Sequence, residues 1–176
     1  MSLEKDWTSL SNMVHKAIRA LEKRNVTLAE AFFTSTRTSE VTIRNSEIFT
    51  QNMVDDSGVG FRVVASKSKV GFACTNTLSE KAILETGEKA FAIAKVSSET
   101  LNFALPEASK PAKVKGLFDS RIEEVTIEEA ADVAKREMTT AEDFDKRVIA
   151  KDGRVVFQSG WRGVINTLGV DFEEQE

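Results

Sequence analysis

The sequence has little of the chemistry on which secreted, membrane and metal-binding proteins depend. It contains one cysteine, Cys74, so no disulfide can form within the chain, as is compatible with a reducing cytosol. No apolar run approaches the ~20 residues of a membrane-spanning helix, and no basic segment followed by an apolar one opens the chain. These absences predict a soluble, cytoplasmic protein without a membrane partner.

The sequence has one histidine and one cysteine, whereas a zinc hydrolase needs about three protein ligands. The only histidine, His15, has no second histidine one helical turn away, so the chain lacks a helical His-Glu metal motif. His15 lies off the apolar stripe of its helix, which favours a surface residue, the alternative being a pH-sensitive contact. Cys74 is predicted to be a small buried hydrophobe. We therefore predict no catalytic, cofactor-binding or metal-binding residue in the chain.

The charge pattern gives no sign of an anion or cation site. The net charge is −4 and the pI is about 5.3, with scattered basic residues, so we expect no direct nucleic-acid contact. Residues 58–60 (Gly-Val-Gly) lead into a strand and not a helix, which argues against a phosphate loop. Residues 55–58 lack the spacing of a calcium loop and are predicted to form a turn. The carboxylates of 123–142 are predicted to be a solvated helical face.

The first half of the chain alternates helical and strand periodicity. An apolar stripe predicts a helix over about residues 6–24. Strands are then expected near 29–36, 40–45 and 47–54, joined by turns at 37–39 and 45–46.

Residues 56–79 predict a β-hairpin that runs into a helix. Two runs of alternating apolar residues flank the polar tip 66–69, and Gly71 is expected to bend the return strand or to lie under another element. Both runs are expected on the inner side of the sheet: Val59, Phe61, Val63 and Ala65 in the first, Val70, Phe72 and Cys74 in the second. Ser79 is predicted as the N-cap of a helix to about Lys95, with Gly87 packed closely on the sheet.

The second half begins with a break in pattern. Residues 98–115 hold both prolines and predict an extended connection, which the alternating Leu101, Phe103 and Leu105 would dock on a surface. A capping box at Thr126 predicts a helix to about Glu142. A tight turn is expected at Asp152-Gly153, followed by a strand that breaks at 160–163. The acidic end at 171–176 is expected to fray. Trp161 is either a core residue or a partner contact.

Together these patterns predict an α+β fold. A mainly antiparallel sheet, made of a meander and a hairpin, would carry three packed helices in two lobes. The lobes would comprise residues 1–97 and 116–176, joined by 98–115. At 176 residues such a chain can bury roughly 70% of its unfolded surface without disulfides or metal.

The order of these segments resembles the amino-terminal domain of the TldD/PmbA proteins, over nearly the whole chain. The segments that carry the likeness are Glu30–Phe33, Glu40–Arg44 with Glu47, Gly58–Val63, Gly71–Ala73, Thr75–Ser79, a helix with Ala90, Ala92 and Ala94, and Val164–Gly169. The resemblance implies a zinc metallopeptidase family, also named for modulation of DNA gyrase, that acts on peptides or unfolded polypeptides. It further implies a two-subunit assembly with a homologous or paralogous subunit.

In that family the zinc is held by a His-Glu-x-x-x-His motif and a later cysteine, and this sequence contains neither. No catalytic or metal residue can therefore be transferred to a position in it, and whether this chain is an enzyme stays open. The resemblance implies a non-catalytic amino-terminal portion that shapes the chamber and the subunit contacts, with zinc only in the full-length member. The alternative is a self-contained peptide- or protein-binding module with an exposed sheet edge.

Overall fold

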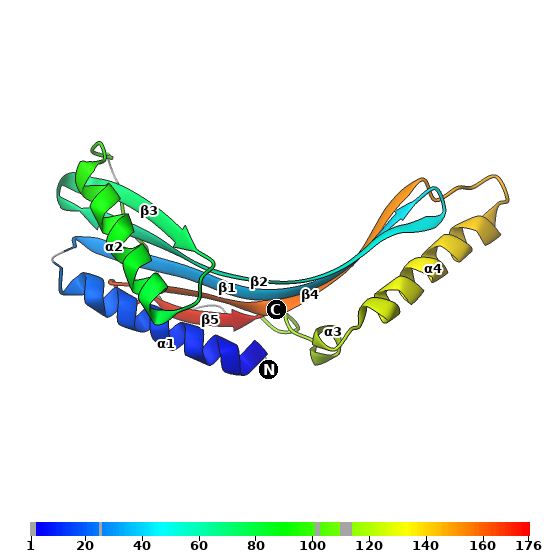
Figure 1. Ribbon diagram of the computed structural model, residues 1–176, viewed down its shortest axis with the longest axis horizontal. Helices are drawn as coiled ribbons and strands as arrows, with labels where there is room; N and C mark the ends of the chain where they lie inside the picture. The colour runs from blue at the N-terminus through cyan, green and yellow to red at the C-terminus, as the bar shows by residue number, and fades with distance from the viewer. Residues whose placement is uncertain (1–2, 25, 101–102, 110–113) are drawn as a thin grey trace. The chain divides into compact units, whose positions relative to one another are not determined.

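The computed structural model describes residues 3–24, 26–100, 103–109 and 114–176. Five strands form one sheet in the order β3-β2-β1-β4-β5, with helices packed on it, which confirms the α+β prediction (Figure 1). The elements in chain order are α1 (Leu3–Glu22), β1 (Leu28–Arg44), β2 (Glu47–Ala65), a 3-10 turn (Ser66–Ser68), β3 (Lys69–Thr75), α2 (Glu80–Val96), α3 (Ser120–Glu123), α4 (Ile127–Phe144), β4 (Asp152–Asn166) and β5 (Asp171–Gln175). None of the described helices is both long and apolar enough to cross a membrane.

Three predicted strand breaks are wrong. β1 continues through 37–39, β2 through 55–58 and β4 through 160–163. In β1 the poor strand formers point inward, since Ser35 and Ser39 are buried and the Ser57 hydroxyl donates to Ser35 Oγ at 2.8 Å. Neighbouring strands satisfy the backbone there, so tertiary pairing outweighs local propensity.

The end of the chain also differs from its prediction. Asp152 and Gly153 begin β4 and do not form a turn. Residues 171–175, expected to fray, form β5 and pair antiparallel with β4 from Ile165↔Asp171 to Trp161↔Gln175. A strand neighbour already in place explains why this acidic segment is ordered.

The turn at residues 45–46 and the two helix caps are as predicted. Asn45 and Ser46 have φ values of 52° and 59°, as the tight turn of a two-residue hairpin requires. The Ser79 hydroxyl accepts from the backbone N–H of Ala82, and Thr126 and Glu129 form the capping box of α4. The short α3 was not predicted, because it is a single turn capped by an aspartate.

The chain divides into two compact units, which are described separately below. Unit 1 comprises the chain through residue 35, residues 56–115 and residues 161–175, and unit 2 comprises residues 36–55, 116–160 and 176. β1, β2 and β4 each contribute to both units. The predicted division into lobes at 98–115 stays a prediction.

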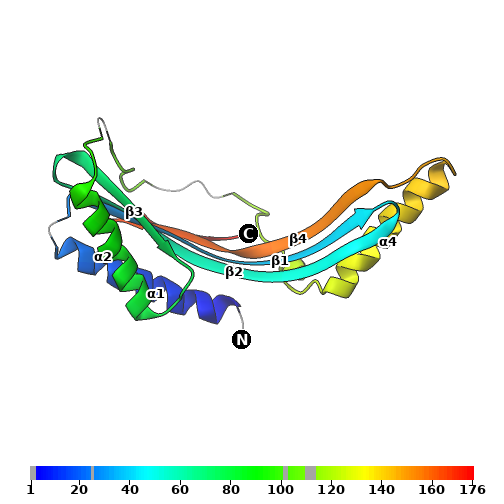
Figure 2. The ribbon, with the colours of Figure 1, turned by 45° about the horizontal axis from the view of Figure 1, so that its top comes forward.

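In unit 1, α1 and α2 lie on the same face of the sheet (Figure 2). The centre of this core is aromatic: the Trp7 ring stacks on Phe33 at 4.8 Å and on Trp161 at 5.7 Å between centroids. The buried residues around it come from both helices and from β1, β2 and β4, and include Leu10, Val14, Leu21, Ala31, Val59, Phe61, Val63, Ile83, Ala90 and Ile165.

In unit 2, α4 packs on β1 and β4 through alanines. Ala130, Ala131 and Ala134 meet Val41, Ile43 and Val155, and all six are buried. The short side chains let the helix approach the sheet closely, as its narrow stripe predicts.

The connection after α2 docks on unit 1, as its alternation predicts. Leu105 is buried, and the Asn166 side-chain amide donates to the carbonyl oxygen of Pro106 at 2.8 Å. The Phe103 ring lies 5.6 Å from the guanidinium carbon of Arg62. Leu101 and Pro111 fall outside the described residues.

Glycine sets how closely α2 can pack. A Cβ on Gly71 would lie 2.1 Å from the Ala90 carbonyl oxygen and 2.4 Å from the Ala94 nitrogen, so β3 lies directly under the α2 backbone. Gly87 faces Leu21 of α1, at 3.3 Å from its ideal Cβ, and not the sheet as expected. Because α2 lies so close to β3, the residues of β3 that face the helix must be small.

We expect Gly71→Ala to lower the free energy of unfolding by about 2 kcal/mol or more, because two helix backbone atoms would have to move. The matched control is Gly60→Ala on the paired strand, where the nearest atom to the ideal Cβ is 3.9 Å away. That control should stay within about 1 kcal/mol of the wild type. Urea denaturation measures both; equal stabilities of the two variants would contradict the packing of α2 on β3.

Candidate functional site

His15 is held by two partners and is not a freely solvated residue. Its Nδ1 lies 2.9 Å from the Ser11 carbonyl oxygen and its Nε2 lies 3.1 Å from Asp171 Oδ2 on β5. The side chain keeps 29% of its surface exposed. Partial burial lowers its pKa, but the Ser11 carbonyl, Asp171 and the nearby Glu173 outweigh burial, and the pKa is raised overall.

Cys74 is exposed, so its predicted burial is wrong. The register pairs Phe61 with Ala73 and Val63 with Gly71, so the residues of β3 that face α2 are Ala73 and Gly71. Phe72 and Cys74 therefore point to the other face, where Phe72 is 60% exposed. The alternation of β3 predicts the wrong face for its large residues, because the pattern alone does not show that α2 needs small residues beneath it.

The other candidate residues of the sequence analysis lie within the strands of the sheet. Trp161 packs on Trp7 beside the core, in agreement with the core prediction, and its buried indole N–H has no acceptor among the described residues. Gly58 and Gly60 lie within β2 and open no helix. Asp55 also lies in β2, where its hydrogen bonds to Arg37, of 2.7 Å and 3.0 Å, lower its pKa.

The side chains that could bind a metal are dispersed. Over the residues that the structure describes, no three His, Cys, Asp or Glu side chains come together as a candidate metal site. His15 belongs to α1, on the helix-covered face of the unit 1 sheet, whereas Cys74 points to the opposite face. Among the described residues, the donor atoms therefore do not fit a zinc centre.

The face of the unit 1 sheet opposite α1 and α2 bears an apolar hollow of about 440 Å³. Gly60 forms its floor, and Phe32, Phe72 and Cys74 stand around it, with Phe32 52% exposed. At one side the Arg62 guanidinium donates to the carboxylate of Glu30, which is itself buried. The missing side chain at Gly60 is what opens the hollow between the two phenylalanines. The alternation of Phe72 and Cys74 predicts one shared face of the sheet, but the pattern alone does not show that this face lies opposite the helices.

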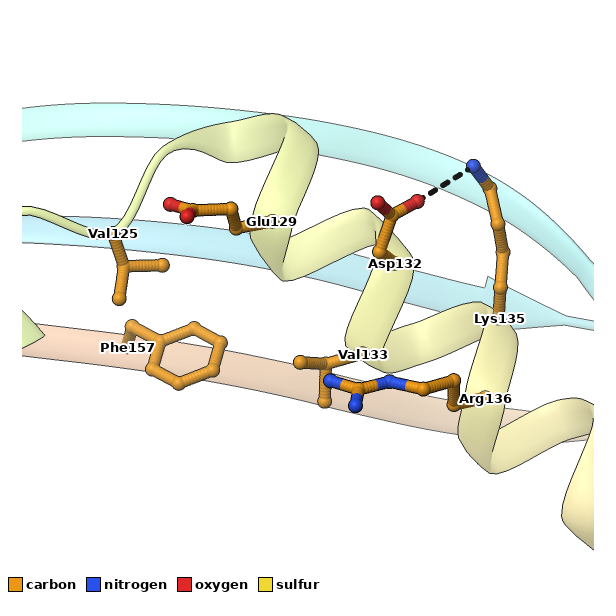
Figure 3. Close-up of a pocket in the computed structure, with 7 residues that line it drawn as sticks. All are labelled: Val125, Glu129, Asp132, Val133, Lys135, Arg136 and Phe157. Carbon is orange, nitrogen blue, oxygen red and sulfur yellow. Dashed lines mark hydrogen bonds and ion pairs between the residues drawn. The ribbon is translucent and has the colours of Figure 1, made fainter.

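A second hollow, of about 670 Å³, lies between α4 and β4 in unit 2 (Figure 3). Its floor is apolar, formed by Val125, Val133 and Phe157. Charged side chains of α4 surround the floor: Glu129, Asp132, Lys135 and Arg136. The Lys135 ammonium pairs with Asp132 at 3.0 Å, and Glu129 takes part in the capping box.

Comparison with known proteins agrees with this fold. Residues 29–94 match the family model described as PmbA/TldA metallopeptidase domain 1. Over this stretch the chain is therefore similar to the first domain of that metallopeptidase family. The matched residues run from β1 to the last turns of α2 and therefore include the β2–β3 hairpin around which the sequence is organised. No curated protein matched the sequence.

Three solved structures share the fold of this chain, and each covers 93% of it. TldE from Thermococcus kodakarensis is 21% identical with a TM-score of 0.82. A candidate modulator of a DNA gyrase from Thermotoga maritima is 20% identical, and one from Bacteroides thetaiotaomicron is 13% identical, each with a TM-score of 0.76. The chain spans 36% to 38% of the length of these proteins.

The His15 contacts predict a pH-dependent stability. Because the folded pKa lies above the unfolded value, the contribution of His15 is fully present below about pH 6.5 and is lost as pH rises through the folded pKa. The stability difference between wild type and His15→Gln should therefore be larger near pH 5.5 than near pH 8.5, and should not exceed about 1 kcal/mol. Asp171→Asn should flatten the same profile. A difference that grows with pH, measured by urea denaturation in both buffers, would contradict the assignment.

The exposure of Cys74 predicts that a small maleimide modifies the native protein at a rate within about tenfold of the rate for the unfolded chain. Gly60→Leu should slow the reaction, because its side chain would fill the hollow beside Cys74. Mass spectrometry follows the modification. Labelling that proceeds only in denaturant would show that Cys74 is buried after all.

Proposed function

We propose that this domain is the non-catalytic amino-terminal portion of a TldD/PmbA-like metallopeptidase that acts on peptides or unfolded polypeptides. In this role it shapes the chamber in which the substrate is held and makes contacts to a homologous or paralogous subunit in the cytoplasm. The observation that carries the proposal is the match of residues 29–94 to the first metallopeptidase domain of the family.

Two features of the surface support a scaffold role. Large apolar side chains are left exposed at positions where a partner domain or subunit could cover them, namely Phe32 and Phe72 in unit 1 and Phe144 and Ile149 in unit 2. Over the described residues, in contrast, the donor atoms do not fit a zinc centre. The zinc of the full-length protein would then be held by residues beyond these 176, where the chemistry of peptide hydrolysis would also take place.

A second candidate is a self-contained module that binds peptides at a sheet edge. It is favoured by the edge strands, because β3 pairs with β2 only from Val59 onward and leaves the outer side of residues 47–57 of β2 without a strand in the described part of the chain. Such an edge can accept an extended peptide through main-chain hydrogen bonds. The net charge of −4 does not favour a third role, direct DNA binding.

The coding sequence beyond Glu176 separates the two candidates. The peptidase proposal expects an in-frame continuation that encodes His-Glu-x-x-x-His followed by a cysteine. A stop codon directly after Glu176 would favour the binding module.

Biochemistry provides the functional test of the peptidase proposal. The 176-residue chain should release no peptides from an unfolded protein such as reduced casein and should retain no stoichiometric zinc after gel filtration. It should form a stable complex with a TldD/PmbA chain that lacks its own amino-terminal domain. One zinc ion per chain, or hydrolysis that a chelator abolishes, would show that this domain is itself catalytic.

A further inference from the structure

The outer edge of β4 in unit 2 is open. β4 lies beside β1 on one side, and on its other side β5 pairs with it only from Trp161 to Ile165, extended by two hydrogen bonds of 2.8 Å and 2.9 Å between Gly160 and Glu176. Within the described residues, no strand covers that side of β4 before Gly160. A row of backbone N–H and C=O groups is therefore available to a further strand.

The direction of each backbone group follows from that pairing. Gly160 donates to and accepts from Glu176, so its N–H and C=O point outward from β1. Because the direction alternates along a strand, the N–H groups of Gln158, Val156 and Arg154 point outward as well. Residues 154, 156 and 158 are all exposed, and no described strand pairs with them on that side.

The hollow between α4 and β4 lies beside this edge. In Figure 3, Phe157 of β4 lies below Val125 and beside Val133 of α4, and these three apolar side chains form the floor of the hollow. The hollow, of about 670 Å³, is large enough for a leucine or phenylalanine side chain. An added strand at the β4 edge would direct alternate side chains onto the same face as Phe157.

Two of the four charged groups at the hollow lack an ion-pair partner among the described residues: Arg136, and Glu129, whose carboxylate accepts hydrogen bonds in the capping box. Asp132 and Lys135 form an ion pair, whereas the Arg136 guanidinium has no partner among the described residues. Figure 3 shows this guanidinium pointing along Val133 toward Phe157, above β4. A carboxylate would satisfy it with paired hydrogen bonds, which the planar guanidinium favours.

We propose that the outer edge of β4, with the hollow under α4, binds an extended segment of another polypeptide as an additional strand. The segment places an apolar side chain on the floor and an acidic side chain, two residues away, on Arg136. The open backbone edge selects a strand, the floor selects the apolar residue, and Arg136 selects the acid. This site differs from the β2 edge of the second candidate function, because it lies on the outer edge of β4 and combines that edge with the hollow under α4.

The test uses the 176-residue chain and a fluorescein-labelled peptide, Thr-Lys-Thr-Leu-Thr-Asp-Thr-Lys, amidated at its end. Fluorescence anisotropy should show saturable binding. Replacing the peptide leucine by serine should weaken binding at least about tenfold, because a buried apolar side chain is lost. Replacing its aspartate by asparagine should weaken binding at least about fivefold, and should have no further effect in the Arg136→Gln variant.

Two matched pairs of protein variants locate the site. Arg136→Gln should weaken binding at least about fivefold, whereas Lys135→Gln, next to it on α4 and already paired, should change it less than about twofold. Val156→Pro removes one outward N–H and should abolish binding, whereas Val156→Thr keeps the N–H and should not. Urea denaturation of each variant establishes that it is folded.

Three results would overturn the proposal. The first is no binding up to about 1 mM peptide, a limit that corresponds to about −4 kcal/mol of binding free energy. The second is binding that folded Arg136→Gln and Val156→Pro variants retain. The third is concentration-dependent dimerisation that Val156→Pro abolishes and the peptide does not compete with, because a second copy of the chain would then occupy the edge.

Discussion

The structure depends on β1 being the central strand of the sheet. β1 runs for 17 residues between β2 and β4, and its odd-numbered residues are buried over most of its length. In unit 1 it supplies Phe33, whose ring lies against Trp7 and over Gly163, where a Cβ would come within 2.4 Å of the ring. In unit 2 it supplies Val41 and Ile43 beneath α4. Each core is therefore built on the same strand and cannot form without it.

Close packing on one face of the unit 1 sheet leaves apolar residues on the other. α2 approaches β3 so closely that glycine and alanine must lie beneath it, and the larger Phe72 and Cys74 of β3 are directed outward. The same alternation exposes Phe32 on β1, while Gly60 leaves the space between the two rings open. The surface that a partner or substrate could use is thus a consequence of how the core is packed.

The sequence predicted what depends on a few neighbouring residues, such as the cap at Ser79, the capping box at Thr126 and the turn at Asn45-Ser46. Prediction from the sequence failed where pairing with a distant strand decides the structure. β1 continues through Arg37-Thr38-Ser39, and β5 forms only because β4 lies beside it. The hollow of unit 2 could not be predicted for the same reason. Residues 125, 133, 136 and 157 come together only when α4 packs against β4, and no local pattern marks Arg136 as unpaired.

Amide hydrogen exchange across β1, followed by NMR, tests the account most directly. A continuous central strand predicts slow exchange at Ala31 and Phe33, at Val41 and Ile43, and also through Arg37 to Ser39, with faster exchange in the edge strands β3 and β5. Exchange at residues 37–39 as rapid as in an unstructured peptide would mean that β1 is two strands joined by a turn. In that case neither the shared strand nor the surfaces built on it would stand.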